Sequence, residues 1–541
     1  MNRRMVSVLA LAFLAGSLVF ALVTHLTNPV LPEDDAYITY RYADNLLNGQ
    51  GLVYNPGQRV FGSSTPLYVL WLAGIHSLAR SVPTPDLAVR ANFIFYAMAI
   101  VGIFFLLTSL GISTGLAALL AGLVSMRQSF LQSSLAGMET FLFAGLLVWS
   151  LWALVTRRFR LSAWLAGFSV LTRPEGLLMV ILFFVSCLAE RRNWRDLIGL
   201  LLPGLAWVAF ATPYFGTPIY NSILAKNRPL YPLPPGHALA TLTTWVTSWT
   251  VGGWLLWPEG LLPFCFLLLA LVVVAAIFGY IVRARLDDTP RWNVTLAVPA
   301  LLALFGLFYA ASNPLLFTWY FPPVECLWFA ALASGVIFAA DWLSRRGHRT
   351  PAAIPVSGLL VLAIMPALLP LRSRLVAKRP LTDLRIESLA DRSRTADYRD
   401  VAEWLNEVVP PGDTVLSPEV GSLGYYYRGP VVDACGLVSP EALPFLPVPA
   451  DERNGPGAIS LGLVKHLQPD VVVAMKKLSC RSLYPSEWFH QSYALARQTP
   501  LKLPLRLWAP GGDTIEVFFR RGGRAAQNGR DAAEETLNRE R

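Results

Sequence analysis

Two adjacent carboxylates and a nearby arginine are the residues of this sequence best suited to chemistry. Asp34 and Asp35 follow the first long apolar run, and Arg41 lies seven residues after Asp34. If a helix begins near Asp34, residues seven apart share one face and lie about 10 Å apart along the axis. A carboxylate can take a proton from a hydroxyl group, and a guanidinium can hold a phosphate through paired hydrogen bonds. The alternative is that the acidic pair only starts a helix and stabilises its dipole.

A glycine-rich segment follows the acidic pair. Residues 48–67 contain four glycines and two prolines, a composition that allows unusual backbone angles or a close approach of the backbone to a ligand. A plain connecting loop is the alternative. Arg59, within this segment, is a further candidate for binding a sugar or phosphate group.

Four more charged residues complete the candidate site. Arg173 and Glu175 are expected at the outer end of an apolar run, where charged groups usually line a polar cavity. The alternative is that they pair with each other. Lys226 and Arg228 follow an apolar run and precede a proline-rich loop. They could bind a phosphate, or they could form a basic loop beside anionic lipid headgroups.

The elements that must position these residues are membrane helices. The chain has 541 residues, of which 54% are hydrophobic and 15% are charged, whereas about a quarter of a soluble domain is charged. Apolar runs long enough to cross a bilayer account for that difference. They predict about eleven transmembrane helices, near residues 6–26, 89–110, 115–126, 140–155, 161–171, 177–188, 197–211, 261–281, 294–311, 324–340 and 354–371.

Positive charge sets the expected orientation. The net charge of +10 comes largely from arginine clusters beside apolar runs, which does not indicate nucleic-acid binding. The clusters at residues 157–160, 191–195, 283–291 and 345–349 all fall on the cytoplasmic side if the apolar run 67–78 does not cross the membrane. We therefore place that run in the membrane plane or in a re-entrant segment, and the region after Leu371 outside the cell.

The region after Leu371 reads as a separate domain. Residues 398–408 predict a helix, and residues 414–417, 430–434 and 470–475 predict strands. We thus expect a transmembrane module over 1–371 with its first outer loop at 28–88, an extracytoplasmic α/β domain over 372–520, and a disordered polar tail over 521–541. Cys435 and Cys480 lie in this region and could pair, but no spacing of histidine or cysteine indicates a metal site.

At the acidic pair the sequence resembles a known family. The run DDAYITYRYADNLLNGQGLVYNPGQRVFGSSTPLY, which starts at Asp34, is similar to the first-loop signature of the GT-C glycosyltransferases related to mycobacterial terminal arabinofuranosyltransferases. Weaker similarity continues in AGMET at 136–140 and TRPEG at 172–176, and in PGDT and GSLGYY in the last third of the chain.

The resemblance implies a GT-C fold, a polyprenyl-phosphate sugar donor and an inverting displacement. The paired acids of the family match Asp34 and Asp35, and its early arginine matches Arg41. A divalent metal is compatible with this chemistry and not required by it. Residues 62–64 are small here, where the arabinofuranosyltransferase pattern has an aromatic or acidic residue. The identity of the sugar therefore stays open.

The working hypothesis is a sugar transferase in a bacterial cytoplasmic membrane. Asp34 or Asp35 would act as general base, the acceptor would be a glycan or lipid of the cell envelope, and the chain would contact membrane lipids but no nucleic acid. A transporter or lipid flippase would explain the apolar runs equally well, but it leaves the acidic first loop and the large outer domain unexplained. A third hypothesis is a non-catalytic scaffold whose outer domain binds partners.

Overall fold

The computed structural model describes most of the chain. The described residues are 3–27, 31–192, 194–228, 230–251, 262–286, 294–348, 350, 353–364, 389–454, 457–501 and 514–527. The chain forms two compact units. The first unit consists of Met1–Pro29, Val89–Trp207 and Pro234–Leu384, and the second of Val30–Ala88, Val208–Leu233 and Arg385–Arg541. The predicted first outer loop thus folds, from Val30 onward, in the same unit as the carboxyl-terminal region.

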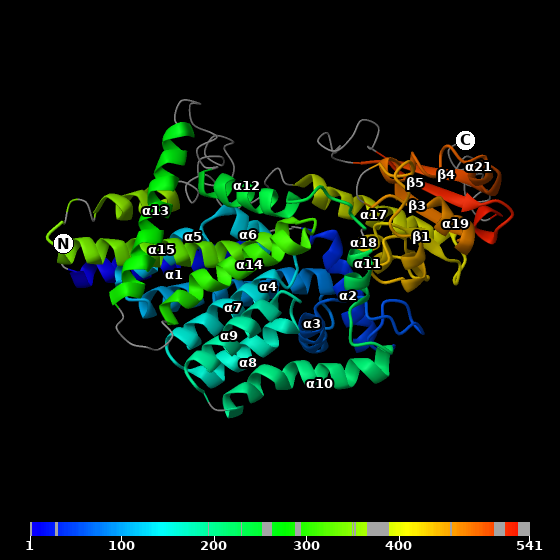
Figure 1. The fold of residues 1–541 in the computed structure, drawn as a ribbon. Coiled ribbons are helices and arrows are strands. Elements are labelled where there is room, and N and C mark those ends of the chain that lie inside the picture. Colours follow the sequence, from blue (N-terminus) through cyan, green and yellow to red (C-terminus); the bar gives the residue numbers. More distant parts are fainter. Residues whose placement is uncertain are drawn as a thin grey trace. The chain divides into compact units, whose positions relative to one another are not determined.

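The first unit is helical. Its helices, two of which extend into segments of the second unit, are α1 (Arg3–Thr27), α4 (Thr84–Ser109), α5 (Thr114–Ser125), α6 (Gln128–Ser134), α7 (Thr140–Val155), α8 (Phe159–Val170), α9 (Gly176–Ala189), η1 (Trp194–Leu197), α10 (Ile198–Phe215), α12 (His237–Val251), α13 (Leu262–Leu286), η4 (Val294–Leu296), α14 (Ala297–Ser312), η5 (Thr318–Tyr320) and α15 (Phe321–Arg345). Figure 1 shows α7, α8 and α9 as neighbours, which agrees with the contacts between these helices.

Within the described residues, five helices are long and apolar enough to cross a membrane. They are Arg4–Thr27, Thr84–Ser109, Arg195–Phe215, Phe266–Arg285 and Thr318–Arg345. A sixth span results if α5 and α6, which meet at a bend of 63°, count as one. Shorter apolar helices lie at Pro66–Leu78, Thr140–Val155, Gly176–Ala189, Ala297–Ser312 and Ala353–Ile364. The chain is therefore a multi-pass membrane protein, and the count of eleven spans stays a prediction.

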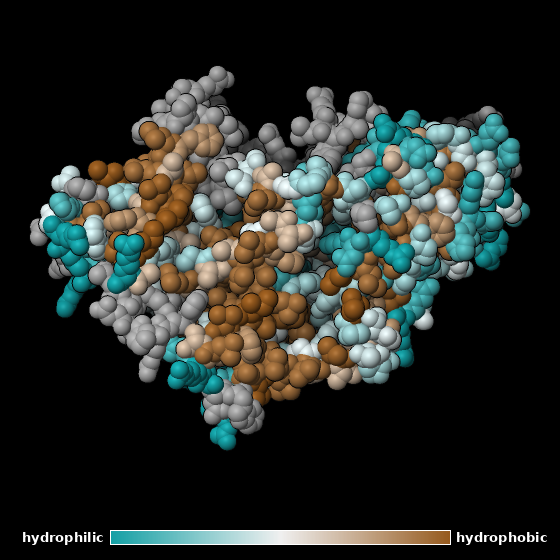
Figure 2. All heavy atoms as spheres, in the orientation of Figure 1, coloured by the Kyte–Doolittle hydropathy of each residue, from teal (hydrophilic) through white to brown (hydrophobic). Residues whose placement is uncertain are grey.

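The first unit exposes much of its apolar surface. Only 22% of the apolar window in the Arg195–Phe215 helix is buried, against 67% in Thr318–Arg345. Hydrophobic side chains cover α8, α9, α10 and α13 in Figure 2. A surface of this kind is stable in hydrocarbon and costly in water, as expected for helices that face lipid. The interior is tight: a Cβ at Gly279 of α13 would overlap the backbone of Gly335 in α15, so this crossing requires small residues.

The second unit contains the remaining elements. Its helices are α2 (Asp34–Leu47), α3 (Pro66–Leu78), α11 (Asn221–Asn227), α17 (Leu389–Val408), α18 (Ser422–Tyr426), η6 (Pro440–Phe445), α19 (Leu461–Leu467), α20 (Lys476–Ser479) and α21 (Glu487–Ser492). Helix α3 starts with proline at its first position, where the missing N–H costs nothing. The apolar run 67–78 falls in this helix of 13 residues, and its orientation in the membrane stays a prediction.

One mixed sheet organises the carboxyl-terminal part of this unit. Its strands are β1 (Val415–Ser417), β2 (Val431–Asp433), β3 (Val471–Met475), β4 (Tyr493–Pro500) and β5 (Thr514–Arg520), in the order β2-β1-β3-β5-β4. Strand β1 is parallel to β2 and β3, whereas β5 is antiparallel to β3 and β4. Figure 1 shows the sheet with α18, α19 and α21 beside it.

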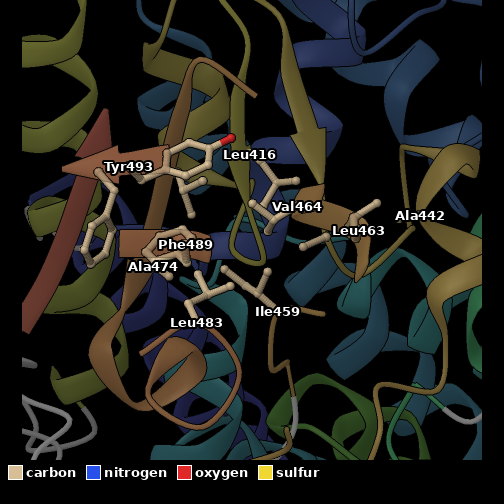
Figure 3. Close-up of a cluster of buried hydrophobic side chains, with 12 residues drawn as sticks. Leu416, Ala442, Ile459, Leu463, Val464, Ala474, Leu483, Phe489 and Tyr493 are labelled. Carbon is tan, nitrogen blue, oxygen red and sulfur yellow. The ribbon is translucent and has the colours of Figure 1, made fainter. Parts of the chain in front are cut away.

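The core of the sheet is apolar and closely packed. Figure 3 shows Leu416 of β1 and Ala474 of β3 together with Leu463 of α19, Phe489 of α21 and Tyr493 of β4. The rings of Phe489 and Tyr493 stack with centroids 4.9 Å apart. All five side chains are buried, which gives this region a hydrophobic core of its own.

The local predictions for this region are confirmed in part. The expected helix and the three expected strands are present as α17, β1, β2 and β3, whereas β4 and β5 were not predicted. Of the tail 521–541, residues up to Gln527 are ordered in the structure, and Arg524 contacts the Asp413 carboxylate at 2.5 Å. The prediction of disorder is therefore wrong for this first part, and residues 528–541 lie outside the described residues.

Candidate functional site

The acidic pair lies at the start of α2, in the second unit. Helix α2 begins at Asp34, as expected. The Asp34 carboxylate accepts hydrogen bonds from the backbone N–H groups of Gly421 at 3.1 Å and Ser422 at 2.9 Å. These N–H groups stand at the start of α18, where an anion is stabilised by unpaired donors. Asp34 thus joins the beginnings of two helices that are 387 residues apart in the chain.

Asp34 and Asp35 have different surroundings. Asp34 is 8% exposed, whereas Asp35 is half-buried. Burial raises the pKa of the Asp34 carboxyl, although the Arg394 guanidinium and the two backbone N–H groups act in the opposite direction. Both carboxylate oxygens of Asp34 thus accept a hydrogen bond from the protein, and Asp35 is the more exposed of the two residues.

A second charged group, which sequence reasoning missed, lies close to Asp34. Arg394 of α17 contacts the Glu419 carboxylate at 2.7 Å, and the Tyr398 hydroxyl donates to the other oxygen of Glu419 at 2.5 Å. Burial raises the pKa of Glu419, and the negative charge of Asp34 adds to this rise. Glu419 was not singled out from the sequence as a site residue. The residue carries no local signal, because its neighbours come from distant segments.

Arg41 lies on the same helix but is enclosed by protein. Its guanidinium is 7% exposed and stacks over the Tyr54 ring at 4.6 Å. Burial lowers the pKa of this group. The geometry favours a positioning role for Arg41, in which it fastens α2 to the loop after α18, over direct contact with a phosphate. Its acceptors are the backbone oxygens of Tyr54, Gly424, Tyr427 and Gly429 and the side-chain oxygen of Asn55.

Three other candidates lie at the surface of the second unit. Arg59 is exposed and stacks over the ring of Tyr214 at 4.7 Å. Lys226 and Arg228 are also exposed, and Arg228 donates to the backbone oxygen of Leu443 at 3.0 Å. The contacts described for Arg59 and Arg228 are thus with Tyr214 and with the backbone of Leu443.

Arg173 and Glu175 form a buried cluster in the first unit. The Arg173 guanidinium lies 3.2 Å from the Glu175 carboxylate and 3.8 Å from that of Glu139. It also donates to the backbone oxygen of Trp319 and stacks over the Tyr320 ring at 4.4 Å. The expected alternative, in which Arg173 and Glu175 pair, is the arrangement observed. This triad consists of one arginine and two glutamates. Its place in a polar cavity stays a prediction.

Metal and disulfide chemistry have little support in the described part of the chain. No group of three or more His, Cys, Asp or Glu residues there has the geometry to hold a metal ion. Cys435 and Cys480 are free thiols, so they do not form the pair that the sequence allowed. The reactive groups at the start of α2 are thus carboxylates and guanidinium groups.

Comparisons with known proteins agree with this architecture. An archaeal oligosaccharyltransferase, AglB from Archaeoglobus fulgidus, solved with an inhibitory peptide and a dolichol-phosphate, superposes with a TM-score of 0.51 at 13% identity, over 94% of this chain and 74% of that one. The chain has the fold of the GT-C glycosyltransferases. ArnT from Cupriavidus metallidurans, another GT-C protein, gives a TM-score of 0.49 at 14% identity over 94% of this chain and 97% of its own.

Sequence comparison adds a relative that is similar to part of this chain. A terminal β-(1→2)-arabinofuranosyltransferase of Mycobacterium tuberculosis is 28% identical over 225 residues. The alignment covers 36% of this chain and 34% of that protein, so the match spans about a third of the curated relative's length. Residues 386–518, which include the sheet, match a domain of unknown function, DUF8728.

Proposed function

We propose that this protein transfers a sugar from a polyprenyl-phosphate carrier to a glycan or lipid acceptor of the cell envelope. The observation that carries the proposal is the acidic pair at the start of α2, in which Asp34 is buried against the backbone of α18 and Asp35 is half-buried. The GT-C fold, the similarity to an arabinofuranosyltransferase and the dolichol-phosphate bound by AglB support the same reaction class.

The reaction needs a base that takes a proton from the acceptor hydroxyl. In the proposed mechanism an acceptor hydroxyl attacks the anomeric carbon of the donor sugar, and Asp35 takes the hydroxyl proton. The bond between the anomeric carbon and the phosphate oxygen breaks, and polyprenyl phosphate leaves with the electron pair. Attack opposite the leaving group inverts the anomeric centre. Asp34, fixed by two N–H groups, keeps the start of α2 in place beside the reacting atoms.

The leaving phosphate needs positive charge more than it needs a proton. Arg394 is the cation that the fold brings toward Asp34, and Lys477 adds positive charge near Glu419. The donor groups of Arg41 are already engaged by the protein. We assign the phosphate contact to Arg394, because its side chain is 21% exposed while it pairs with Glu419, whereas Arg41 is buried. Arg59, Lys226 and Arg228 of the second unit stay proposed donor contacts, and Arg173 and Glu175 of the first unit stay a separate proposal.

The proposed orientation places the site outside the cell. With the arginine clusters in the cytoplasm, the start of α2 and the carboxyl-terminal sheet are extracytoplasmic, at the outer face of a bacterial inner membrane. A donor carried by a membrane lipid reaches this face without a nucleotide.

A transporter is the second candidate, and one observation favours it. Helices α5 and α6 are bent by 63° at a short break, and broken helices are typical of transporter substrate sites. The two functions differ in their products, because a transferase forms a new glycosidic bond and a transporter does not.

Transfer by the purified protein is the direct test. We expect the protein, in liposomes with a synthetic polyprenyl-phosphate pentose or hexose and an oligosaccharide acceptor, to yield elongated glycan and one polyprenyl phosphate per sugar transferred. Mass spectrometry of the glycan and of the lipid measures both products. Movement of the labelled donor across the bilayer without elongation, over a panel of sugars and acceptors, would contradict transfer and favour the transporter.

Arg394→Gln is expected to weaken use of the donor. Loss of a charge-assisted hydrogen bond to phosphate costs about 1.5–3 kcal/mol, which corresponds to roughly a tenfold to hundredfold rise in the donor KM. The acceptor KM should stay within about twofold of wild type. The matched control is Arg399→Gln on the same helix, where Arg399 makes a partly exposed pair with Glu403 at 3.2 Å. An unchanged donor KM in a stable Arg394→Gln protein would remove Arg394 from the phosphate site.

A further inference from the structure

A pocket in the first unit has a lining that shares no residue with the proposed transferase site. It has a volume of about 310 Å³ and lies where α8, η1 and the start of α10 meet. This volume is in the range of small-ligand sites. The lining residues are Arg160, Trp164, Arg195, Asp196, Ile198 and Gly199.

Positive charge exceeds negative charge in this pocket. The Asp196 carboxylate, which is 5% exposed, lies 2.9 Å from Arg192 and 3.6 Å from Arg160. Arg195 adds a third guanidinium to a single carboxylate. The Arg160 side chain is 79% exposed, so it can turn toward a ligand at little cost. The excess charge predicts an anionic ligand.

One wall of the pocket is aromatic. The Trp164 ring lies against the first turn of α10, because a Cβ at Gly199 would stand 2.7 Å from the ring. Tryptophan is enriched where protein crosses from hydrocarbon to the headgroup region of a bilayer. Glycine at position 199 therefore lets an interfacial ring close the pocket against helix backbone.

Helix α10, which contributes Ile198 and Gly199 to the pocket, has an exposed apolar face. Helix α10 belongs to the candidate span Arg195–Phe215 and exposes Leu201, Leu202 and Leu205 by 51%, 48% and 60%. In Figure 2 hydrophilic side chains border the apolar surface near the start of α10. A ligand with a charged head and a hydrocarbon tail matches both the basic pocket and the apolar face of α10. A soluble anion matches only the pocket.

We propose that this pocket binds the headgroup of an anionic glycerophospholipid, with the acyl chains along α10. The guanidinium groups of Arg160 and Arg195 hold the phosphate, since arginine pairs with phosphate through two hydrogen bonds. The arginine clusters that contribute these residues are those expected on the cytoplasmic side, where a lipid phosphate meets basic pockets between helices. The site is independent of the proposed transferase reaction.

Native mass spectrometry of the full-length protein in detergent tests the proposal. We expect phosphatidylglycerol to bind at least tenfold more tightly than phosphatidylcholine, because both carry a phosphate but only the first has a net negative charge. In the double variant Arg160→Gln/Arg195→Gln this preference should fall to about twofold. The control is Arg345→Gln, which removes an exposed arginine of α15 that pairs with Asp341 at 2.9 Å.

Three outcomes would overturn the proposal. These are equal binding of the two lipids by wild type, an unchanged preference in the folded double variant, or an equal loss of preference in Arg345→Gln. Millimolar inorganic phosphate should not displace the lipid, and full displacement would identify a site for a soluble phosphate instead. Trp164→Leu keeps both arginines and should weaken binding of both lipids, so it provides a second test if the double variant is unstable.

Discussion

Asp35→Asn is expected to reduce the rate of sugar transfer by on the order of a hundredfold to ten-thousandfold, the usual cost of losing a general base. Asparagine preserves the shape of the side chain and cannot take the acceptor proton. Because Asp35 is half-buried and its charge raises the pKa of the neighbouring Asp34, stability is measured together with activity. The measurement is kcat for transfer from a synthetic polyprenyl-phosphate sugar, with the melting temperature recorded in detergent.

Asp34→Asn separates the two carboxylates. The two N–H donors of Gly421 and Ser422 lose an ionised acceptor in this variant, so it should lower the melting temperature as well as the activity. The control is Glu407→Gln, which removes an exposed carboxylate of α17. Glu419 would not serve as a control, because it pairs with Arg394 at 2.7 Å. Full activity in Asp35→Asn together with an inactive, stable Asp34→Asn would make Asp34 the base. Full activity in both would place the catalytic centre elsewhere.

Arg41→Met is expected to destabilise the protein strongly even when no donor is present. The methionine side chain fills part of the space but cannot donate to the buried backbone oxygens of Gly424 and Tyr427. Each buried acceptor without a partner costs about 1–3 kcal/mol, so we expect a loss of about 3 kcal/mol or more in the free energy of unfolding. Thermal unfolding followed by intrinsic fluorescence in detergent measures the effect.

The control for Arg41 is an arginine of the same segment with a different environment. Arg59 is exposed and stacks over Tyr214, so Arg59→Met should change the free energy of unfolding by no more than about 1 kcal/mol. An Arg41→Met protein with the stability of wild type and a raised donor KM would contradict the positioning role. That result would restore the interpretation in which Arg41 holds the carrier phosphate.

Local patterns in the sequence predicted the local structure of this site well. Helix α2 begins at Asp34 because two carboxylates precede a run of helix-compatible residues, a signal contained in a few neighbouring positions. Strands β1, β2 and β3 are short apolar runs between turn residues, and they were predicted for the same reason. Strands β4 and β5 were missed: β4 has the sequence YALARQTP, which shows no alternation of apolar and polar residues, and stands at the edge of the sheet.

The sequence by itself determined the membrane character, the GT-C resemblance and the acidic pair, because composition, apolar runs and adjacent residues are properties of the chain as written. Only the tertiary structure decided what each charged group does. Asp34 meets Ser422, and Arg41 meets Gly429, across 388 residues in both cases. Hydropathy and residue spacing carry no information about such contacts, since partners this far apart are brought together by packing of the whole unit. For that reason the sequence did not show that Arg41 is enclosed by backbone oxygens or that Arg394 comes close to Asp34.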